Sequence, residues 1–362
     1  MADQNLDRFT PLHHIWPDGP AQLISELESN GFGVEFHSDA AKSLIEAHWE
    51  KLQIPRSLDS DQADLFSYCY IKDRKSKAFR AEVWGLVFCE NNANVLGALS
   101  EAAPALVLKH ADAALDFVLR KVHPKMWTGT SSPIPERVQA EAGVVIGPNC
   151  EIAEDVILEA GVRLGAFVKI GPGTRIGANS CVYDYCQIGS ACEIKAQSVI
   201  GGRGFGFLQY PNVPRPIQRV HVGRVVIGDY VRIGSLVGVD RGVFEDTTIK
   251  TATAIDNFVQ VAHNCELGAG NVLCGFVGLS GSTKMGDQVT IGGMSGTAGH
   301  LKIGNNVMIA GQTGVSGDVA SNSVVKGYPP RPLKETLKIE VLTGKLPEIY
   351  NRLKAVEEKL KS

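Results

Sequence analysis

The sequence lacks the features that mark several broad classes of protein. No apolar run reaches the roughly 18 residues that a membrane-spanning helix needs. The opening residues, MADQNLDRFT, have neither the basic nor the apolar region of a signal peptide. The formal net charge is only −3, which gives the chain no overall attraction to nucleic acid. We therefore expect a cytoplasmic protein with no membrane span and no nucleic-acid partner.

The eight cysteines also lack the spacing of a metal or disulfide framework. No two of them are separated by two residues, which argues against a zinc knuckle. In a long cytoplasmic chain we expect them to be thiols. Four cysteines fall at one recurring position of the repeat described next, and we interpret them as small packing residues: Cys150, Cys186, Cys192 and Cys265.

What the sequence does have is an aliphatic residue at every sixth position. The series runs through Ile146, Ile152, Leu158, Leu164, Ile170, Ile176, Val182, Ile188, Ile194 and Ile200, resumes at Ile227, Ile233 and Val239, and continues in a shifted phase through Ile249, Ile255, Val261, Leu267, Leu273, Leu279, Met285, Ile291, Thr297, Ile303, Ile309 and Val315. In most of these repeats, a small residue lies four positions after the aliphatic residue. Strands this short cannot bury their own faces, so they must stack on copies of themselves. The pattern predicts a β-solenoid over residues 145–327.

The flanks do not follow this repeat. Residues 1–125 contain apolar segments such as EVWGLVFCE and a helical segment, ADAALDFVLRKV, and predict a small α/β domain; residues 126–144 form a linker. The loop 201–226 interrupts the solenoid and is long enough to predict a function. Residues 328–362 have helical spacing. From Lys326 onward there are nine Lys or Arg and five Glu, a balance of +4, typical either of a solvated helix or of a docking surface for an acidic partner.

The repeat resembles the hexapeptide repeat of left-handed parallel β-helices, in which three hexads, 18 residues, make one triangular coil. In such a coil, residues 18 positions apart lie above one another, so reactive residues from separate repeats can become neighbours. Gly281 lies 18 residues after His263, and His300 lies 37 residues after it, one beyond two coils. We expect these three residues to form a column on one corner, with Asp256 on the neighbouring face. A histidine can accept a proton near neutral pH, and a glycine amide can stabilise an oxyanion, so the combination indicates acyl transfer.

Three segments, VDRGVFEDTTI, IDNFVQVAHNC and GGRGFGF, resemble the UDP-3-O-(3-hydroxyacyl)glucosamine N-acyltransferases of lipid A synthesis. The resemblance implies transfer of a 3-hydroxyacyl chain from acyl carrier protein to the 2-amine of a UDP-acylglucosamine. It also implies a homotrimer, no metal and no cofactor beyond the carrier thioester, and uridine binding by residues 1–125. The likeness is strong over 145–330 and weaker back to about 80, and residues 1–65 are distinctly divergent.

The resemblance also assigns roles to individual residues. His263 matches the general base, Gly281 the amide that stabilises the oxyanion, and Asp256 the aspartate of the same motif, which orients the base or the substrate. His300 matches a second histidine that contacts the nucleotide phosphate or the acyl group. Asn264 and Gln260 are expected to contact the sugar.

Two positions depart from the family pattern. The family holds uracil between two aromatic side chains; Phe66 stands where the first is expected, and Tyr68 or Tyr70 is the candidate for the second. Family members also carry a bulky methionine that limits acyl length, and Gly314 occupies the matching position here. We therefore hypothesise a longer acyl-chain groove at Gly314.

Three other functions remain open from the sequence. A related enzyme could use a different nucleotide amino sugar or acetyl-CoA as substrate. A zinc enzyme on the same scaffold would need three converging histidines, and the solenoid region contains only His221, His263 and His300. A structural solenoid without catalytic activity is the last alternative.

Overall fold

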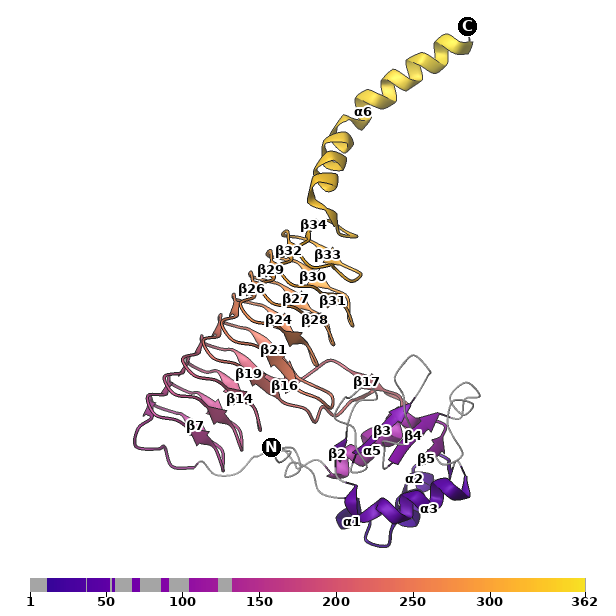
Figure 1. The fold of residues 1–362 in the computed structure, drawn as a ribbon, viewed down its shortest axis with the longest axis vertical. Helices are drawn as coiled ribbons and strands as arrows, with labels where there is room; N and C mark the ends of the chain where they lie inside the picture. The colour runs from indigo at the N-terminus through magenta and orange to yellow at the C-terminus, as the bar shows by residue number, and fades with distance from the viewer. Residues whose placement is uncertain are drawn as a thin grey trace. The chain divides into compact units, whose positions relative to one another are not determined.

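The structure, a computed structural model, describes residues 12–36, 38–52, 54–55, 67–71, 86–90, 104–122 and 132–361. The chain forms two compact units (Figure 1). The first unit comprises Met1–Thr128 together with Arg203–Arg224 and Arg241–Asp246; the second comprises Gly129–Gly202, Val225–Asp240 and Thr247–Ser362.

The first unit is an α/β domain, as the sequence predicts. Its sheet has the order β1-β5-β4-β3-β2, with β1 antiparallel to β5 and the other pairs parallel. The strands are β1 (Val34–Phe36), β2 (Ile54–Pro55), β3 (Ser67–Ile71), β4 (Leu86–Glu90) and β5 (Ala105–Leu108). The helices are α1 (Leu12–Ile15), α2 (Pro20–Ser29), α3 (Asp39–His48), a 3₁₀ turn (Trp49–Lys51) and α5 (Ala111–Val122).

The long loop that interrupts the repeat packs within this first unit. It carries a short hairpin of β17 (Phe207–Leu208) and β18 (Ile217–Gln218). Asp116 of α5 is only 1% exposed and accepts hydrogen bonds from the Tyr210 hydroxyl at 2.7 Å and the Val220 N–H at 2.6 Å. Burial raises the pKa of Tyr210, so the phenol stays protonated and can donate this bond. Residues 203–224 therefore belong with the N-terminal unit, although their position in the sequence lies inside the solenoid.

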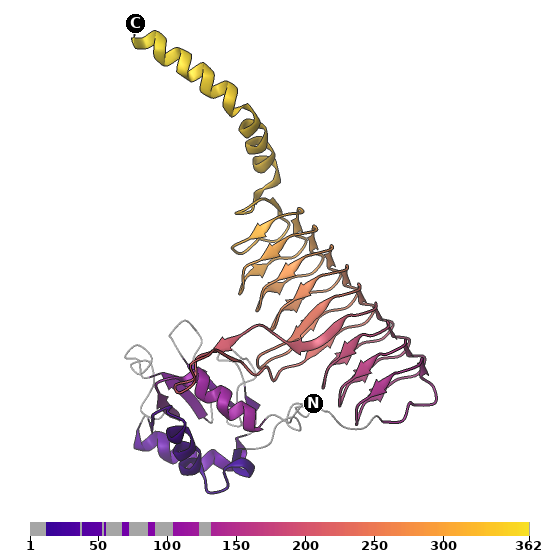
Figure 2. The same cartoon turned by 180° about the vertical axis from the view of Figure 1, so that it is seen from behind.

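The second unit is a parallel β-helix of three sheets (Figures 1 and 2). The nine-stranded sheet contains β7 (Val145–Ile146), β10 (Arg163–Leu164), β13 (Cys181–Val182), β16 (Val199–Arg203), β21 (Gly238–Arg241), β24 (Gln260–Val261), β27 (Gly278–Leu279), β30 (Gly296–Thr297) and β33 (Gly314–Val315). The eight-stranded sheet contains β8 (Glu151–Ile152), β11 (Lys169–Ile170), β14 (Gln187–Ile188), β19 (Val225–Ile227), β22 (Thr247–Ile249), β25 (Glu266–Leu267), β28 (Lys284–Met285) and β31 (Lys302–Ile303). The eleven-stranded sheet contains β6 (Gln139–Ala140), β9 (Ile157–Leu158), β12 (Arg175–Ile176), β15 (Glu193–Ile194), β20 (Arg232–Ile233), β23 (Ala254–Ile255), β26 (Val272–Leu273), β29 (Thr290–Ile291), β32 (Met308–Ile309), β34 (Val324–Lys326) and β35 (Arg331–Pro332).

The register of the coils follows from the six-residue repeat. Gln260 pairs with Gly278, 18 residues on, and Val261 pairs with Leu279. The second residue of these strands points inward, and the aliphatic series forms one continuous buried core. The predicted fold class is confirmed: a left-handed parallel β-helix with a small α/β domain and a C-terminal helix. The aliphatic series changes phase between Val239 and Ile249 because residues 241–246 leave the coil and belong to the first unit.

The C-terminal helix α6 (Leu333–Lys361) follows the last coil. Lys326 of β34 forms a 2.8 Å ion pair with Glu340, and the Thr336 hydroxyl donates to the Lys326 carbonyl at 3.2 Å. These contacts fix the first turns of the helix to the final strands of the β-helix, while the rest of α6 is exposed. Within the described ranges, no helix is both long and apolar enough to cross a membrane.

Candidate active site

The predicted catalytic residues lie on one corner of the β-helix. We call it the site corner: the edge where the chain passes from the nine-stranded to the eight-stranded sheet. His263 and Asn264 form its turn after β24, Gly281 the turn after β27, and His300 the turn after β30. The Ser282 N–H donates to the His263 carbonyl at 2.9 Å, and the His300 N–H donates to the Gly281 carbonyl at 3.0 Å. Three successive coils therefore bring these residues together.

His300 occupies a different position in its turn from His263 and Gly281. The second residue of each turn has a left-handed backbone, with φ of 58° at Asn264 and 61° at His300. His263 and Gly281 take the first position. His300 consequently aligns with Asn264, beside the column that His263 and Gly281 form, and its side chain is exposed. The three residues share the predicted corner, but the predicted column holds only for His263 and Gly281, because His300 stands one residue later in its turn.

The His263 imidazole lies directly over Gly281. A Cβ atom built on Gly281 would lie 2.6 Å from Cε1, 2.7 Å from Nε2 and 3.1 Å from Nδ1 of His263. Cβ atoms essentially never approach this closely, so any side chain at position 281 would displace the ring. The Gly281 backbone does not adopt a positive φ, so its conformation alone would allow another residue. The histidine ring is therefore the reason for glycine at this position.

Asn264 fixes the orientation of the ring. The Asn264 Oδ1 atom lies 3.2 Å from His263 Nδ1. An amide oxygen can only accept, so this contact places the imidazole proton on Nδ1 and makes Nε2 the basic nitrogen. The Asn264 N–H in turn donates to the buried Thr247 hydroxyl at 2.8 Å. Thr247 thus anchors the turn that carries the base, a role that the sequence analysis missed.

The Gly281 N–H is available to a ligand. Within the part of the chain that the structure describes, no acceptor pairs with this group. It lies in the turn next to the His263 ring, on a partly exposed surface. A basic nitrogen and a backbone donor in adjacent coils can serve the two ends of one reaction, because the first accepts a proton and the second stabilises negative charge on oxygen.

A carboxyl group one coil below Ala262, the residue before His263, was also missed. Gly238 and Val239 of β21 pair with Gln260 and Val261, so Asp240 comes next to Ala262, which precedes His263. Burial raises the pKa of Asp240 to about 6, although a 2.9 Å hydrogen bond from the Gln260 amide opposes the shift. Asp240 lies in VDRGVFEDTTI, so its motif was recognised but the residue was not. Gln260 therefore has a carboxyl partner one coil below it.

The remaining predicted residues lie elsewhere. Asp256 lies at the other end of β24, in the turn that follows β23, where its Oδ1 accepts from the Asn257 N–H at 2.7 Å. A role for Asp256 in orienting the imidazole therefore stays a prediction. Phe66 lies outside the described residues. Tyr68 and Tyr70 belong to β3, of which only the backbone is described.

Gly314 occupies the outward position of β33, but the space above it is filled. A Cβ atom built on Gly314 would lie 2.2 Å from Cδ2 and 2.8 Å from Cε2 of Tyr328. The ring of Tyr328 therefore covers the position at which a longer groove was hypothesised.

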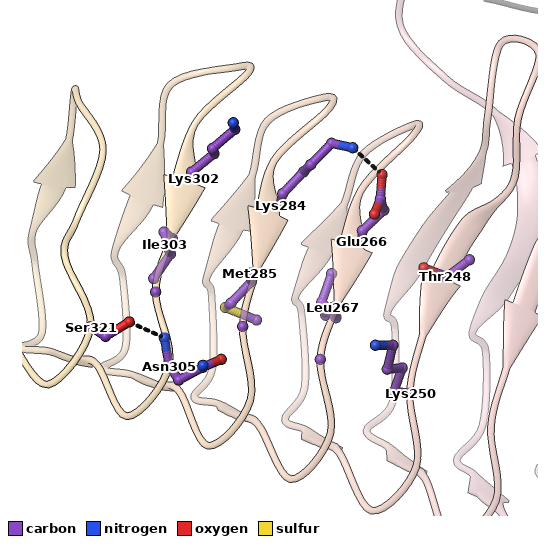
Figure 3. A pocket seen from close by; sticks show the side chains of 13 residues that line it. Thr248, Lys250, Glu266, Leu267, Lys284, Met285, Lys302, Ile303, Asn305 and Ser321 are labelled. Carbon is purple, nitrogen blue, oxygen red and sulfur yellow. Dashed lines mark hydrogen bonds and ion pairs between the residues drawn. The ribbon is translucent and has the colours of Figure 1, made fainter. Parts of the chain in front are cut away.

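A separate groove of about 330 Å³ lies along the eight-stranded sheet (Figure 3). Figure 3 shows the stacked side chains of Thr248, Glu266, Lys284 and Lys302 along it, with a 2.7 Å ion pair between Lys284 and Glu266. None of the predicted site residues lines this groove. Across the described ranges, no group of three or more His, Cys, Asp or Glu side chains could hold a metal ion.

Known proteins with similar sequences identify the family of the chain. The family model for the bacterial transferase hexapeptide (six repeats) matches residues 167–202. The chain is 40% identical over 275 residues to UDP-3-O-acylglucosamine N-acyltransferase 1 of Francisella tularensis, a match covering 71% of this chain and 77% of that protein. It is 54% identical over 168 residues to the UDP-3-O-acylglucosamine N-acyltransferase of Fusobacterium nucleatum, covering 46% of this chain and about half of that protein (50%).

Among solved structures, the UDP-N-acetylglucosamine acyltransferase from Campylobacter jejuni is 22% identical with a TM-score of 0.44, covering 55% of this chain and 73% of that one. The match to the Francisella tularensis protein, at 40% identity, covers more than two thirds of the length of that protein. The hexapeptide coils, the histidine on the site corner and this match agree: the chain belongs to the UDP-3-O-acylglucosamine N-acyltransferase family.

Proposed function

We propose that this acyltransferase moves a 3-hydroxyacyl chain from acyl carrier protein to the 2-amino group of UDP-3-O-acylglucosamine, in lipid A biosynthesis in the cytoplasm. The observation that carries the proposal is the seating of the His263 ring on Gly281, which puts a base and an oxyanion donor in adjacent coils. The names of the matched relatives supply the substrate class.

The reaction follows from these two groups. His263 Nε2 accepts a proton from the sugar amine as the amine attacks the thioester carbonyl. The Gly281 N–H donates to the oxygen that becomes negative in the tetrahedral intermediate. That intermediate collapses, the carbon–sulfur bond breaks, and the thiol of the carrier leaves with a proton. None of these steps requires a metal or a cofactor other than the carrier thioester. We propose that His300 and Asn264, on the site corner, and Gln260, at the start of β24, contact the substrate.

We also propose that the active form is a homotrimer, and the pattern of α6 supports self-association. Its apolar side chains repeat at alternating steps of three and four: Ile339, Leu342, Leu346, Ile349, Leu353, Val356 and Leu360. All but Ile339 are exposed in the single chain. This is a coiled-coil seam with leucine at most of its a positions and β-branched residues at two of its three d positions, a combination that favours three or four strands over two. The basic residues around the seam fit an acidic acyl carrier protein.

Substitution of His263 by alanine tests the proposed function. The expected result is a fall in kcat of at least about 100-fold, because general base catalysis contributes 10²- to 10⁴-fold. Mass spectrometry of the N-acylated product would measure it, with wild-type melting temperature and oligomeric state as the controls. Activity within a few-fold of wild type would refute the base assignment. Parallel assays with other nucleotide amino sugars and with acetyl-CoA would reveal the alternative substrates.

A further inference from the structure

Three outward positions above the site carry no side chain. Gly278, Gly296 and Gly314 are the first residues of β27, β30 and β33, and each stacks on the next in the column that continues from Gln260. We call them the glycine strip. None has a positive φ. Glycine weakens a strand, and nothing lies within 4 Å of a Cβ built on Gly278. The chain itself therefore does not require glycine at that position.

Gly314 differs from the other two because Tyr328 lies against it. Tyr328 is 82% exposed, yet the edge of its ring would meet a Cβ on Gly314 at 2.2 Å. The preceding residue holds the tyrosine in place: the Gly327 N–H donates to the Thr313 hydroxyl at 3.3 Å, and its φ of 96° suits glycine alone. The hairpin of β34 and β35 fixes the segment on both sides. The strip is thus open over Gly278 and closed at Gly314.

One side of the strip is apolar beside Gly278 and Gly296, where Phe276 and Met294 lie. Exposed Leu236, Phe258, Phe276 and Met294 line the opposite edge of the nine-stranded sheet, and the rings of Phe258 and Phe276 stack at 4.8 Å. Toward the site corner, the strip is flanked only by the small residues Ser280, Ala298 and Ser316. The strip passes beside Gly281, where the thioester carbonyl must lie, and extends two coil steps further, roughly 10 Å at normal strand spacing.

We propose that Tyr328 is a specificity-determining residue whose ring ends the path of the acyl chain and so sets the longest chain that is transferred. The inference rests on the proposed acyl transfer at His263 and Gly281. A chain bonded to the thioester carbon can run over Gly278 and Gly296 without meeting a side chain. Beyond Gly296 it meets the ring of Tyr328, which occupies the space left by the missing side chain at Gly314.

Transfer rates from carriers of graded acyl length test this inference. In the wild-type trimer, kcat/KM should drop at least about tenfold between the longest accepted chain and the next longer one. Tyr328→Ala should abolish that drop, so that the longer chain is transferred nearly as well. Tyr328→Phe is the matched control; it keeps the ring and should keep the cut-off. Adding Gly314→Met to Tyr328→Ala should restore a cut-off, because the new side chain refills the same space.

Each outcome separates the inference from the function on which it rests. An unchanged cut-off in Tyr328→Ala, with normal N-acyl product, overturns the inference and leaves the proposed function standing. A changed oligomeric state with the same chain-length preference also overturns it, since the ring would then be a contact between copies. Absence of N-acylated product from the wild type at every chain length refutes the proposed function, and the inference with it.

Discussion

Replacing Gly281 by alanine tests the core of the site with a single methyl group. The new Cβ would lie 2.6 Å from Cε1 and 2.7 Å from Nε2 of His263, whereas carbon atoms in contact normally stand about 3.5–4.0 Å apart. The ring must therefore retreat by about 1 Å. A displacement of that size costs on the order of 100-fold in rate, so we expect kcat to fall by about that factor.

The fold should tolerate the same change. The obstructing atoms belong to the end of a partly exposed side chain and not to the backbone, and the backbone at Gly281 has no positive φ. Alanine also restricts the unfolded chain more than glycine does, which contributes about 0.4–1 kcal/mol in the stabilising direction. We expect the free energy of unfolding to change by less than about 1 kcal/mol.

The assay compares kcat for N-acyl transfer and the melting temperature in five proteins: wild type, Gly281→Ala, Gly317→Ala, His263→Ala and the double variant His263→Ala/Gly281→Ala. Gly317 occupies the same turn position two coils on, and nothing lies within 4 Å of a Cβ built there. Gly317→Ala should retain wild-type activity. The double variant should be no slower than His263→Ala alone, because both changes remove the same group. A Gly281→Ala enzyme within about threefold of wild type would refute the reasoning.

Two further predictions concern stability and assembly. Burial raises the pKa of Asp240 to about 6, so the cost of ionising it in the folded chain is absent below about pH 4 and complete above about pH 6. Asp240→Asn should therefore leave the free energy of unfolding unchanged at pH 4 and raise it at pH 8 by about 1–2 kcal/mol, less than the full shift because solvent screens the partly exposed carboxylate. Denaturation at both pH values measures the change, and an equal effect at both would contradict the burial argument. Leu353→Lys in the α6 seam should weaken self-association in sedimentation equilibrium, whereas Asn351→Lys adds the same charge outside the seam and should not; identical behaviour of the two variants would exclude the seam as a contact between copies.

The sequence predicts the β-helix well because packing dictates its repeat. Each aliphatic residue at the sixth position must point inward, so the coils and their register follow from counting. The same counting placed His263, Gly281 and His300 on one corner, since turn residues repeat with the coils.

What the sequence could not predict depends on contacts outside the repeat. Asp240 and Thr247 acquire their roles where residues 241–246 leave the coil, and Tyr328 acquires its position from a hairpin after the last one. The assignment of loop 203–224 to the N-terminal unit depends on bonds such as that between Tyr210 and Asp116, which link residues far apart in the chain. Periodicity carries no information about such pairings.

The hairpin that follows the last coil has a second consequence, for solubility. A parallel β-helix ends in open strand edges, and such edges can pair with those of another molecule and grow into fibrils. Here β35 runs antiparallel to β34 and forms the outer edge of the eleven-stranded sheet. It contains Arg331 and Pro332 and follows two more prolines. A proline cannot donate a ladder hydrogen bond and an arginine resists burial, so this edge offers little template for a further strand. The last residues before α6 thus protect the eleven-stranded sheet from further strand addition at that end.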